Sequence, residues 1–255
     1  MYQKELDFAR STLKKAYEIY CESPVSVSEK AAFDVVTNVD LAIERYFAEE
    51  LKKAFPDHRL HGEEFSADAP LTDRTWILDP IDGTFNFATG TVHFGLQTAL
   101  WDKGGLQLSV IYLPRLGELY EATLGGGAFC NGAPIHVSAR SPKEAIFSFG
   151  DYPHTRERDA TDEHRLVERA YRTVSRMRMF GAASVDFALL AAGKTEGVVL
   201  YTRNKWDIAP GLLLCREAGA VTYSVDGGPY DFSSRGIFAC NSKELYEALT
   251  KEENI

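Results

Sequence analysis

Two amphipathic helices are predicted near the start of the chain. The first covers residues 2–22 and ends at Ser23-Pro24, because the residue before a proline avoids the helical region. Its apolar residues recur at helical spacing; they are Leu6, Ala9, Leu13, Ala16, Tyr17 and Tyr20. The second is expected to be capped by Asn38 or Asp40 and to stop at Pro56. Its apolar stripe consists of Ile43, Phe47, Leu51 and Phe55.

Strands are predicted from Thr75 onward, where short apolar runs are separated by Gly, Pro and Asn. The runs TWIL, HFGLQTALW, LQLSVIYL, ELYEATL and AFCNG indicate a mostly antiparallel sheet. The second half mixes strands with helices, which we expect at 159–174, Ser184–Ala192, Pro210–Ala218 and after a cap at Asn241. No repeat or linker separates domains, so the predicted class is α+β, with halves 1–140 and 141–255 in one fold unit.

Composition and charge narrow the function classes. The 255 residues are 45% hydrophobic, which is typical of a globular protein, and the formal charge is −9. Lys and Arg are scattered, so no nucleic acid polymer is expected as a partner. The amino terminus has no signal-like apolar run, and no stretch is long enough to cross a membrane. We therefore expect a cytoplasmic protein whose four cysteines, at 21, 130, 215 and 240, are reduced.

The most informative segment is WILDPIDGT at residues 76–84. An apolar strand leads into Asp79, Pro80 disfavours a helix, and Gly83 permits a turn, so Asp79 and Asp82 are directed at a common point. A helix starting near Thr84 directs free N–H groups to the same point, where they suit a phosphate oxygen. The segment thus predicts carboxylates next to a phosphate site.

Further carboxylates are expected to join this pair. Glu63 and Glu64 follow the HRLH stretch, and Asp207 lies just ahead of a predicted helix. Hydrolysis of a phosphomonoester by two divalent cations, about 3.5–4 Å apart, needs several such acids. Oxygen ligands favour Mg²⁺ or Mn²⁺ over zinc. An EF-hand is excluded, because its third and fifth loop positions are here Ile81 and Gly83.

Other phosphate chemistries fail on spacing. An aspartyl-phosphate enzyme needs DxDxT, but Ile81 stands two places after Asp79, and no cysteine is followed by Arg six residues later. Gly193-Lys194-Thr195 lacks the earlier glycine of a phosphate-binding loop and is interpreted as a helix end. His58 and His61 give only a weak metal pattern. Gly125–Gly127 is interpreted as a hairpin turn or bulge.

Five segments together resemble the inositol monophosphatase family. They are FDVVTNVD at 33–40, GEE at 62–64, DPIDGTFNF at 79–87, GAAS at 181–184 and WDIAPG at 206–211. Their order and spacing match the family over roughly residues 5–250. This lithium-sensitive superfamily also contains fructose-1,6-bisphosphatases, histidinol-phosphate phosphatases and nucleotide 3'-phosphatases.

The resemblance implies a five-layer αβαβα sandwich, usually a homodimer, with two or three Mg²⁺ ions and Li⁺ as an inhibitor. It implies these metal ligands: Glu63, Asp79, the carbonyl of Ile81, Asp82 and Asp207. Glu63 and Thr84 would activate the attacking water, with Asp40 supporting Thr84. The implied substrate contacts are Asp82, Gly83, Thr84, Gly181 and Ala183. Lys30 is expected to cover the site, and Glu64 to act behind the ligands.

The sequence departs from the family in the segment that contacts substrate. Leu200 occupies the place where inositol-specific members carry an acid, and Asn204 lies closer to Trp206. Tyr201, Arg203 and Lys205 are candidates to meet a second negative group. Pro210, where many members have alanine, is interpreted as a helix-start residue.

The sequence therefore predicts a Mg²⁺-dependent phosphomonoesterase acting on a small sugar or polyol phosphate through an activated water. Histidinol phosphate, fructose 1,6-bisphosphate and nucleotide 3'-phosphates remain alternative substrates. The alternative of another class is a non-catalytic regulator that binds a phosphate or sugar on the same scaffold.

Overall fold

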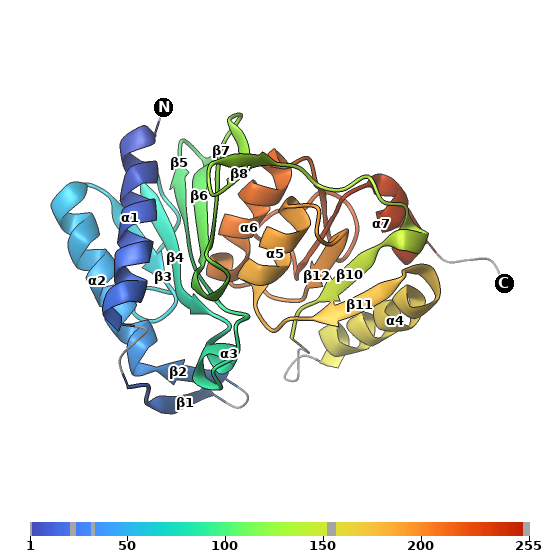
Figure 1. Cartoon of the computed structure of the whole chain (residues 1–255), viewed down its shortest axis with the longest axis horizontal. Helices are drawn as coiled ribbons and strands as arrows, with labels where there is room; N and C mark the ends of the chain where they lie inside the picture. Colours follow the sequence, from blue (N-terminus) through green and yellow to red (C-terminus); the bar gives the residue numbers. More distant parts are fainter. Residues whose placement is uncertain (1, 21–23, 32–33, 152–156, 252–255) are drawn as a thin grey trace.

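The computed structural model describes residues 2–20, 24–31, 34–151 and 157–251. Helices and sheets alternate in five layers (Figure 1). The predicted five-layer αβαβα sandwich is thereby confirmed. Cys21, Phe33 and residues 152–156 lie outside the described residues.

The first two layers are a helix pair and a seven-stranded sheet. The helices α1 (Gln3–Tyr20) and α2 (Asn38–Ala54) pack on one face of the sheet through α1·β6 and α2·β4 contacts. Its strands, in spatial order, are β3 (Arg59–Gly62), β4 (Thr75–Asp82), β5 (Gly95–Asp102), β6 (Gly105–Leu113), β7 (Glu118–Thr123), β8 (Gly127–Cys130) and β9 (Ala133–Ile135). Neighbouring strands are antiparallel except β3 and β4, which are parallel.

The central layer consists of α5 (Ala183–Ala191) and α6 (Lys205–Glu217). Both helices are apolar on nearly all sides, as expected for helices between two sheets. One hydrophobic cluster joins them to the first sheet and to β12, and its buried members include Ile77, Phe187 and Leu213. The predicted boundary at residue 140 lies between the two sheets. Because the central helices contact both sheets, the two halves share one hydrophobic core, and their description as separate halves stays a prediction.

The last two layers belong to the second half of the chain. The five-stranded sheet has the order β11 (Arg176–Met179), β10 (Ile146–Phe149), β12 (Gly197–Leu200), β14 (Ile237–Cys240) and β13 (Val221–Ser224). Its outer face is covered by α4 (Glu157–Thr173) and α7 (Lys243–Thr250), which also contact each other. Short elements complete the chain: the paired strands β1 (Val27–Ala31) and β2 (Asp34–Thr37), the helix α3 (Thr84–Ala88), and the 3₁₀ turns at 114–116 and 142–144.

Three predicted helix starts were wrong. The cap of α2 is Thr37, which forms a capping box with Asp40, and the cap of α7 is Ser242 instead of Asn241. The helix expected from Pro210 begins at Lys205, so Pro210 lies inside it and Asp207 lies in its first turn. An acid in the first turn is favoured by the helix dipole, which explains a start ahead of the proline.

Candidate active site

The carboxyl end of β4 carries Asp79 and Asp82. The strand is buried throughout, and its pairing with β5 is irregular between Asp79 and Asp82. Gly83 follows with φ of 83°, and a Cβ at this position would lie 2.9 Å from the Cβ of Ala182, so a side chain is disfavoured on both grounds. The chain then enters α3 at Thr84, as predicted. Both aspartates are thus placed where a strand ends beside a helix start.

Glu63 and Asp207 reach the same region from other layers. Glu63 follows β3, and its backbone N–H donates to the Leu78 carbonyl at 3.3 Å, next to Asp79. Asp207 lies on α6, which packs against β4. The Thr202 hydroxyl donates to Asp207 Oδ2 at 2.8 Å and fixes this carboxylate. Residues 144 positions apart therefore converge on the end of β4.

Asp40 and Thr84 form a hydrogen-bonded pair beside these acids. The Thr84 hydroxyl lies 3.2 Å from Asp40 Oδ1 and 2.9 Å from the Ile81 carbonyl, both of which accept. Asp40 Oδ2 accepts from the Thr37 backbone N–H at 3.0 Å and from the Thr37 hydroxyl. Burial raises the pKa of Asp40 to about 6, against the opposing effect of the Thr37 hydrogen bonds. Thr84 is thereby oriented by a fully buried carboxyl group.

The acids raise one another's pKa values. Burial, then the charge of Asp207, raise the pKa of Glu63 to about 8. Burial and the charges of Glu63, Asp82 and Asp207 hold the pKa of Asp79 well above its usual range. Burial raises the pKa of Asp82 to about 6, although Ser184 donates hydrogen bonds that favour its ionised form. A buried group of like charges favours a bound cation, because the positive charge stabilises the ionised carboxylates against both burial and mutual repulsion.

The chemistry of the donor set fits a hard divalent cation. Asp79 is 2% exposed, and its Oδ1 atom has no hydrogen-bond partner within the described part of the chain. Lys30 Nζ lies 3.3 Å from Glu63 Oε1 and 3.1 Å from Glu64 Oε2, so one positive charge lies beside these two acids. Across the described ranges, no three His, Cys, Asp or Glu side chains take the spacing of a completed ligand set. A cation that binds here would therefore draw in carboxylates now held by Lys30, Ser184 and Thr202.

Comparison with known proteins decides the family. A family model described as "Inositol monophosphatase family" matches residues 2–254. The chain belongs to the inositol monophosphatase family. Membership confirms the resemblance drawn from the five sequence segments and supports a phosphatase.

Relatives of the family differ in their names. The chain is 35% identical over 240 residues to a fructose-1,6-bisphosphatase/inositol-1-monophosphatase of Thermotoga maritima, covering 92% of this chain and 90% of the relative. It is 32% identical over 243 residues to the Nus factor SuhB of Escherichia coli, covering 94% and 90%. A solved IMPase/NADP phosphatase complexed with Mg²⁺ and phosphate superposes with a TM-score of 0.82 at 27% identity, covering 94% and 91%. Two of these three names describe phosphatases, with different substrates, and the third describes a Nus factor.

The start of α5 lies against Asp82. The backbone N–H of Ala183 donates to Asp82 Oδ1 at 3.1 Å, and that of Ser184 donates to Oδ2 at 2.6 Å. Asn86 of α3 donates to the carbonyls of Phe180 and Gly181 at 2.7 and 3.3 Å. The family segment GAAS is thus joined to the DPIDGT segment by hydrogen bonds. Gly181 and Ala183 lie beside the candidate site, and their contact with substrate stays a prediction.

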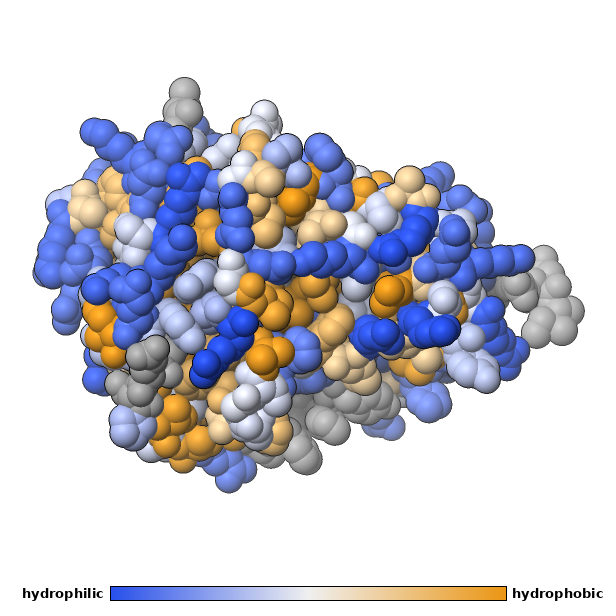
Figure 2. Space-filling view, viewed as in Figure 1, coloured by the Kyte–Doolittle hydropathy of each residue, from blue (hydrophilic) through white to orange (hydrophobic). Residues whose placement is uncertain are grey.

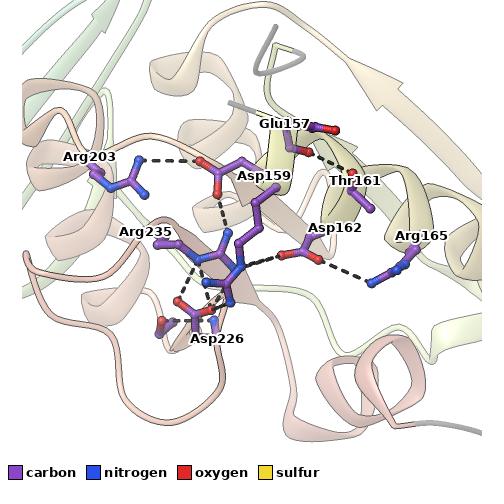
Figure 3. A network of polar contacts seen from close by, with 10 residues as sticks. Glu157, Asp159, Thr161, Asp162, Arg165, Arg203, Asp226 and Arg235 are labelled. Atoms are coloured by element: carbon purple, nitrogen blue, oxygen red, sulfur yellow. Dashed lines mark hydrogen bonds and ion pairs between the residues drawn. The ribbon is translucent and has the colours of Figure 1, made fainter. Parts of the chain in front are cut away.

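The end of β12 and the segment after it differ in burial from residue to residue. Leu200 is 4% exposed and packs in the core, so it offers nothing to a substrate hydroxyl. Tyr201 is also buried, in the cluster of the outer layers. Arg203 is half exposed and its Nη1 lies 3.5 Å from Asp159 Oδ2 of α4, toward which it points in Figure 3. Of the two positively charged residues near Thr202, Arg203 is exposed and Lys205, at the start of α6, is partly buried.

Several weaker sequence patterns are now explained. Trp76 Nε1 donates to His58 Nδ1 at 3.0 Å, and His61 Nδ1 lies 2.6 Å from the Ala69 carbonyl, so both rings have structural partners. Gly193 follows α5 with φ of 65° and donates to the Leu190 carbonyl, which confirms a helix end. Gly125 and Gly126 lie in the turn between β7 and β8, and Gly127 begins β8, which confirms the hairpin.

Sequence reasoning missed the groups that hold the carboxylates. Ser184 donates to Asp82 from its backbone and its hydroxyl, Thr202 donates to Asp207, and Thr37 donates to Asp40. Glu44 of α2 accepts backbone hydrogen bonds from the turn after Glu63. Glu44 follows Asp40 by four residues, one helical turn, which was the available signal.

Proposed function

We propose that the protein is a Mg²⁺-dependent phosphomonoesterase that hydrolyses a small sugar or polyol phosphate with an activated water. The observation that carries the proposal is that Glu63, Asp79 and Asp207 converge from three elements. The charges of neighbouring acids raise the pKa values of Glu63 and Asp79. Asp82 and the Ile81 carbonyl complete the proposed ligand set. Two or three Mg²⁺ ions, or Mn²⁺, are the proposed cofactors, and Li⁺ is the proposed inhibitor.

The proposed mechanism divides the work between ions and side chains. When bound, the divalent cations supply Lewis-acid stabilisation of the phosphate and lower the pKa of the attacking water. Glu63 and Thr84 orient that water, and Asp40 keeps the Thr84 hydroxyl in place through the contact at 3.2 Å. The amides of Gly83 and Thr84 bind phosphate oxygens, as free N–H groups at a helix start do. Glu64 is proposed to act behind the ligands.

The substrate class is proposed from the lining residues. With Leu200 buried, no acid is available there to bind sugar hydroxyls, while Arg203 is half exposed near Thr202. A cation at this place favours a substrate with a second negative group. Fructose 1,6-bisphosphate is therefore a leading candidate, in accord with the name of the Thermotoga relative. Inositol 1-phosphate, histidinol phosphate and nucleotide 3'-phosphates form the comparison set.

A phosphate-release panel tests both parts of the proposal. Each ester is assayed with and without Mg²⁺. We expect Mg²⁺-dependent release, with at least one substrate carrying a second negative group ahead of inositol 1-phosphate. A higher kcat/KM for inositol 1-phosphate than for every other ester would contradict the substrate proposal.

Replacement of a proposed ligand tests the chemistry itself. Asp207→Asn removes one carboxylate charge at constant size, and we expect turnover to fall by at least ~100-fold, because cations at such sites contribute several kcal/mol. The exposed Asp231→Asn is the matched control, since its partners Ser233 and Ser234 lie in a surface turn. Equal activity of Asp207→Asn and the control, with both folded, would refute the assignment.

A homodimer in the cytoplasm is the proposed assembly and location. Phe85, Val92 and Met179 are large apolar residues exposed around α3 and the edge strand β11, and apolar residues reach the surface near α3 in Figure 2. Such a patch beside an unpaired strand edge favours a second copy of the chain. Cys130, Cys215 and Cys240 are free, which suits a reducing compartment. In the described part of the chain, no helix is long and apolar enough to span a membrane.

A non-catalytic regulator is the second candidate, because one relative of similar identity is named a Nus factor. The four acids, Asp40 and Thr84 argue against it, since a binding protein has no need of this costly cluster. Absence of phosphate release from every ester of the panel, by folded protein with Mg²⁺ present, would favour the regulator.

A further inference from the structure

Glu44 is a buried carboxylate, and among the described residues its hydrogen bonds all go to one turn. It lies on α2 and is 1% exposed. Its Oε2 accepts from the backbone N–H of Glu64 at 2.7 Å, and its Oε1 accepts from that of Phe65 at 3.0 Å. The Ser66 hydroxyl donates to Oε1 at 3.3 Å. A buried charge is tolerated only when it is satisfied in this way.

The turn is shaped around this carboxylate. A Cβ on Gly62 would collide with the Glu44 carboxyl group, so only glycine permits the close approach of β3 to α2. The Gly62 N–H donates to Ser66 Oγ at 2.7 Å, which closes the turn on itself. Arg45, next to Glu44, lies over the Phe65 ring with 4.9 Å between Cζ and the ring centroid. Two neighbouring residues of α2 therefore hold residues 62–66 from one side.

The opposite side of the turn is held by the sheet. Glu63 donates its backbone N–H to the Leu78 carbonyl of β4, one residue before Asp79. The backbone of residues 62–65 is thus fixed between β4 and Glu44, and the Glu63 side chain leaves from the middle of this clamp. A small shift of this backbone would move the Glu63 carboxylate relative to Asp79 and Asp207.

We propose that Glu44 is a positioning residue that fixes the Glu63–Glu64 turn for cation binding. The inference rests on the metal-dependent function proposed above. This role explains why a glycine, Gly62, precedes the two acids in the GEE segment. It also gives a function to the buried Glu44 carboxylate, which takes part in no step of the proposed reaction. Groups that orient ligands from behind typically change metal affinity or activity by about 10–100-fold when removed.

Glu44→Gln tests the inference, with Glu196→Gln as the matched control. The amide keeps the size but replaces one accepting oxygen with a donor facing a backbone N–H. Glu196 is equally buried and accepts from the Ile146 N–H at 2.6 Å and from Ser138 and Arg140, both at 2.7 Å. It precedes β12, whose far end leads to Thr202, so it lies away from the candidate site. Ser66→Ala is a milder variant that removes only the hydroxyl.

Mg²⁺ affinity is measured by calorimetry on the metal-free proteins, after circular dichroism has verified their folding. We expect the Kd of Glu44→Gln to rise by about 10–100-fold, that of Ser66→Ala to rise by a smaller factor, and that of Glu196→Gln to stay within about twofold of wild type. Both Gln variants are expected to lose thermal stability, so affinity separates positioning from simple structural support.

Two results would overturn the inference separately from the proposed function. If wild type binds Mg²⁺ and folded Glu44→Gln binds it equally well, Glu44 serves the fold alone. If Glu44→Gln fails to fold, an unchanged Kd in Ser66→Ala overturns the inference. Absence of Mg²⁺ binding by wild type would instead defeat the proposed function, and the inference with it.

Discussion

Hydroxyl groups fix the carboxylates of the candidate site. Thr202 donates to Asp207, Ser184 donates to Asp82, and Thr37 donates to Asp40. Each of these hydroxyl groups lies at the start of a helix: Thr202 just before α6, Ser184 in the first turn of α5, and Thr37 at the cap of α2. The backbone of each helix start therefore helps to orient the hydroxyl group. Hydrogen bonds of this kind orient a carboxylate before a cation binds, and both oxygens of Asp82 and of Asp40 already accept them.

Thr202→Val tests this role. Valine keeps the shape of threonine but removes the donor to Asp207 Oδ2, so we expect activity or Mg²⁺ affinity to fall by about 10–100-fold, with a stability loss of only about 1 kcal/mol. Steady-state kinetics with a Mg²⁺ titration measure the effect. Thr222→Val is the control, because its hydroxyl accepts from Arg216 away from the acids. Identical kinetics for the two variants would show that Asp207 needs no such support.

At this scale the sequence predicted acids better than their supports. Asp79, Asp82 and Asp207 stand next to Gly, Pro or Trp in distinctive segments, and the family resemblance assigned them. Ser184 lies in the GAAS segment, but its partner Asp82 is far away along the chain, and Thr202 lies in no distinctive segment, so neither hydroxyl was assigned a role. Glu44 looked like one more charge on a helix, and only its burial distinguishes it.

Elements were predicted well in their interiors and less well at their ends. The predicted apolar stripes of α1 and α2 are confirmed, since they include the buried residues Leu13, Ile43 and Phe47. All five candidate residues have side chains that can cap a helix, and at Thr37 and Ser242 this is combined with the extended backbone conformation of a cap. The predictions of Asn38, Asp40 and Asn241 were therefore wrong by one to three residues. Side-chain chemistry alone does not reveal that backbone conformation.

One arginine ties α4 to the segment between β13 and β14. Arg235 is paired with Asp159 and Asp162 of α4 and with Asp226, and Figure 3 shows all three acids around its guanidinium group. Asp159 also meets Arg203, so the network reaches the segment that precedes Asp207. Arg158 adds contacts to Asp162 and Asp226. The hydrogen bonds and charge of Arg235 hold the pKa of Asp226 below its usual value.

Arg235→Gln should therefore destabilise the protein in a pH-dependent way. Loss of a buried partner of Asp159 is expected to cost about 3 kcal/mol, or a Tm decrease of roughly 6–12 °C. Because the pKa of Asp226 is depressed in the folded state, its contribution is present above its usual value of 3.8 and is lost as pH falls below it. Thermal melts from about pH 7 to about pH 3 should show the difference from wild type shrinking with acid.

The exposed pair Arg172–Glu168 provides the control for this prediction. Both side chains are more than 60% exposed, so Arg172→Gln is expected to change stability by less than about 0.5 kcal/mol at any of these pH values. A difference between Arg235→Gln and wild type that stays constant or grows with acid would contradict the assigned sign.

In the whole molecule, the candidate site lies where three layers meet. Asp40 comes from the outer helices, Asp79 and Asp82 from the first sheet, and Asp207 from the central helices. No single segment contains the site, so periodicity alone could not predict it. The layer order came from the family resemblance, and the seven- and five-stranded sheets agree with it. The convergence of the acids was expected from the acidic segments themselves and from the resemblance.

The location of bound metal is the most direct test of the central claim. Crystals grown with Mn²⁺ in place of Mg²⁺ would reveal the ions by anomalous scattering. The account predicts peaks within roughly 2.0–2.6 Å of the carboxylate oxygens of Glu63, Asp79, Asp82 and Asp207. Saturating Mn²⁺ with no peak among these four side chains, or with peaks only elsewhere on the molecule, would contradict it.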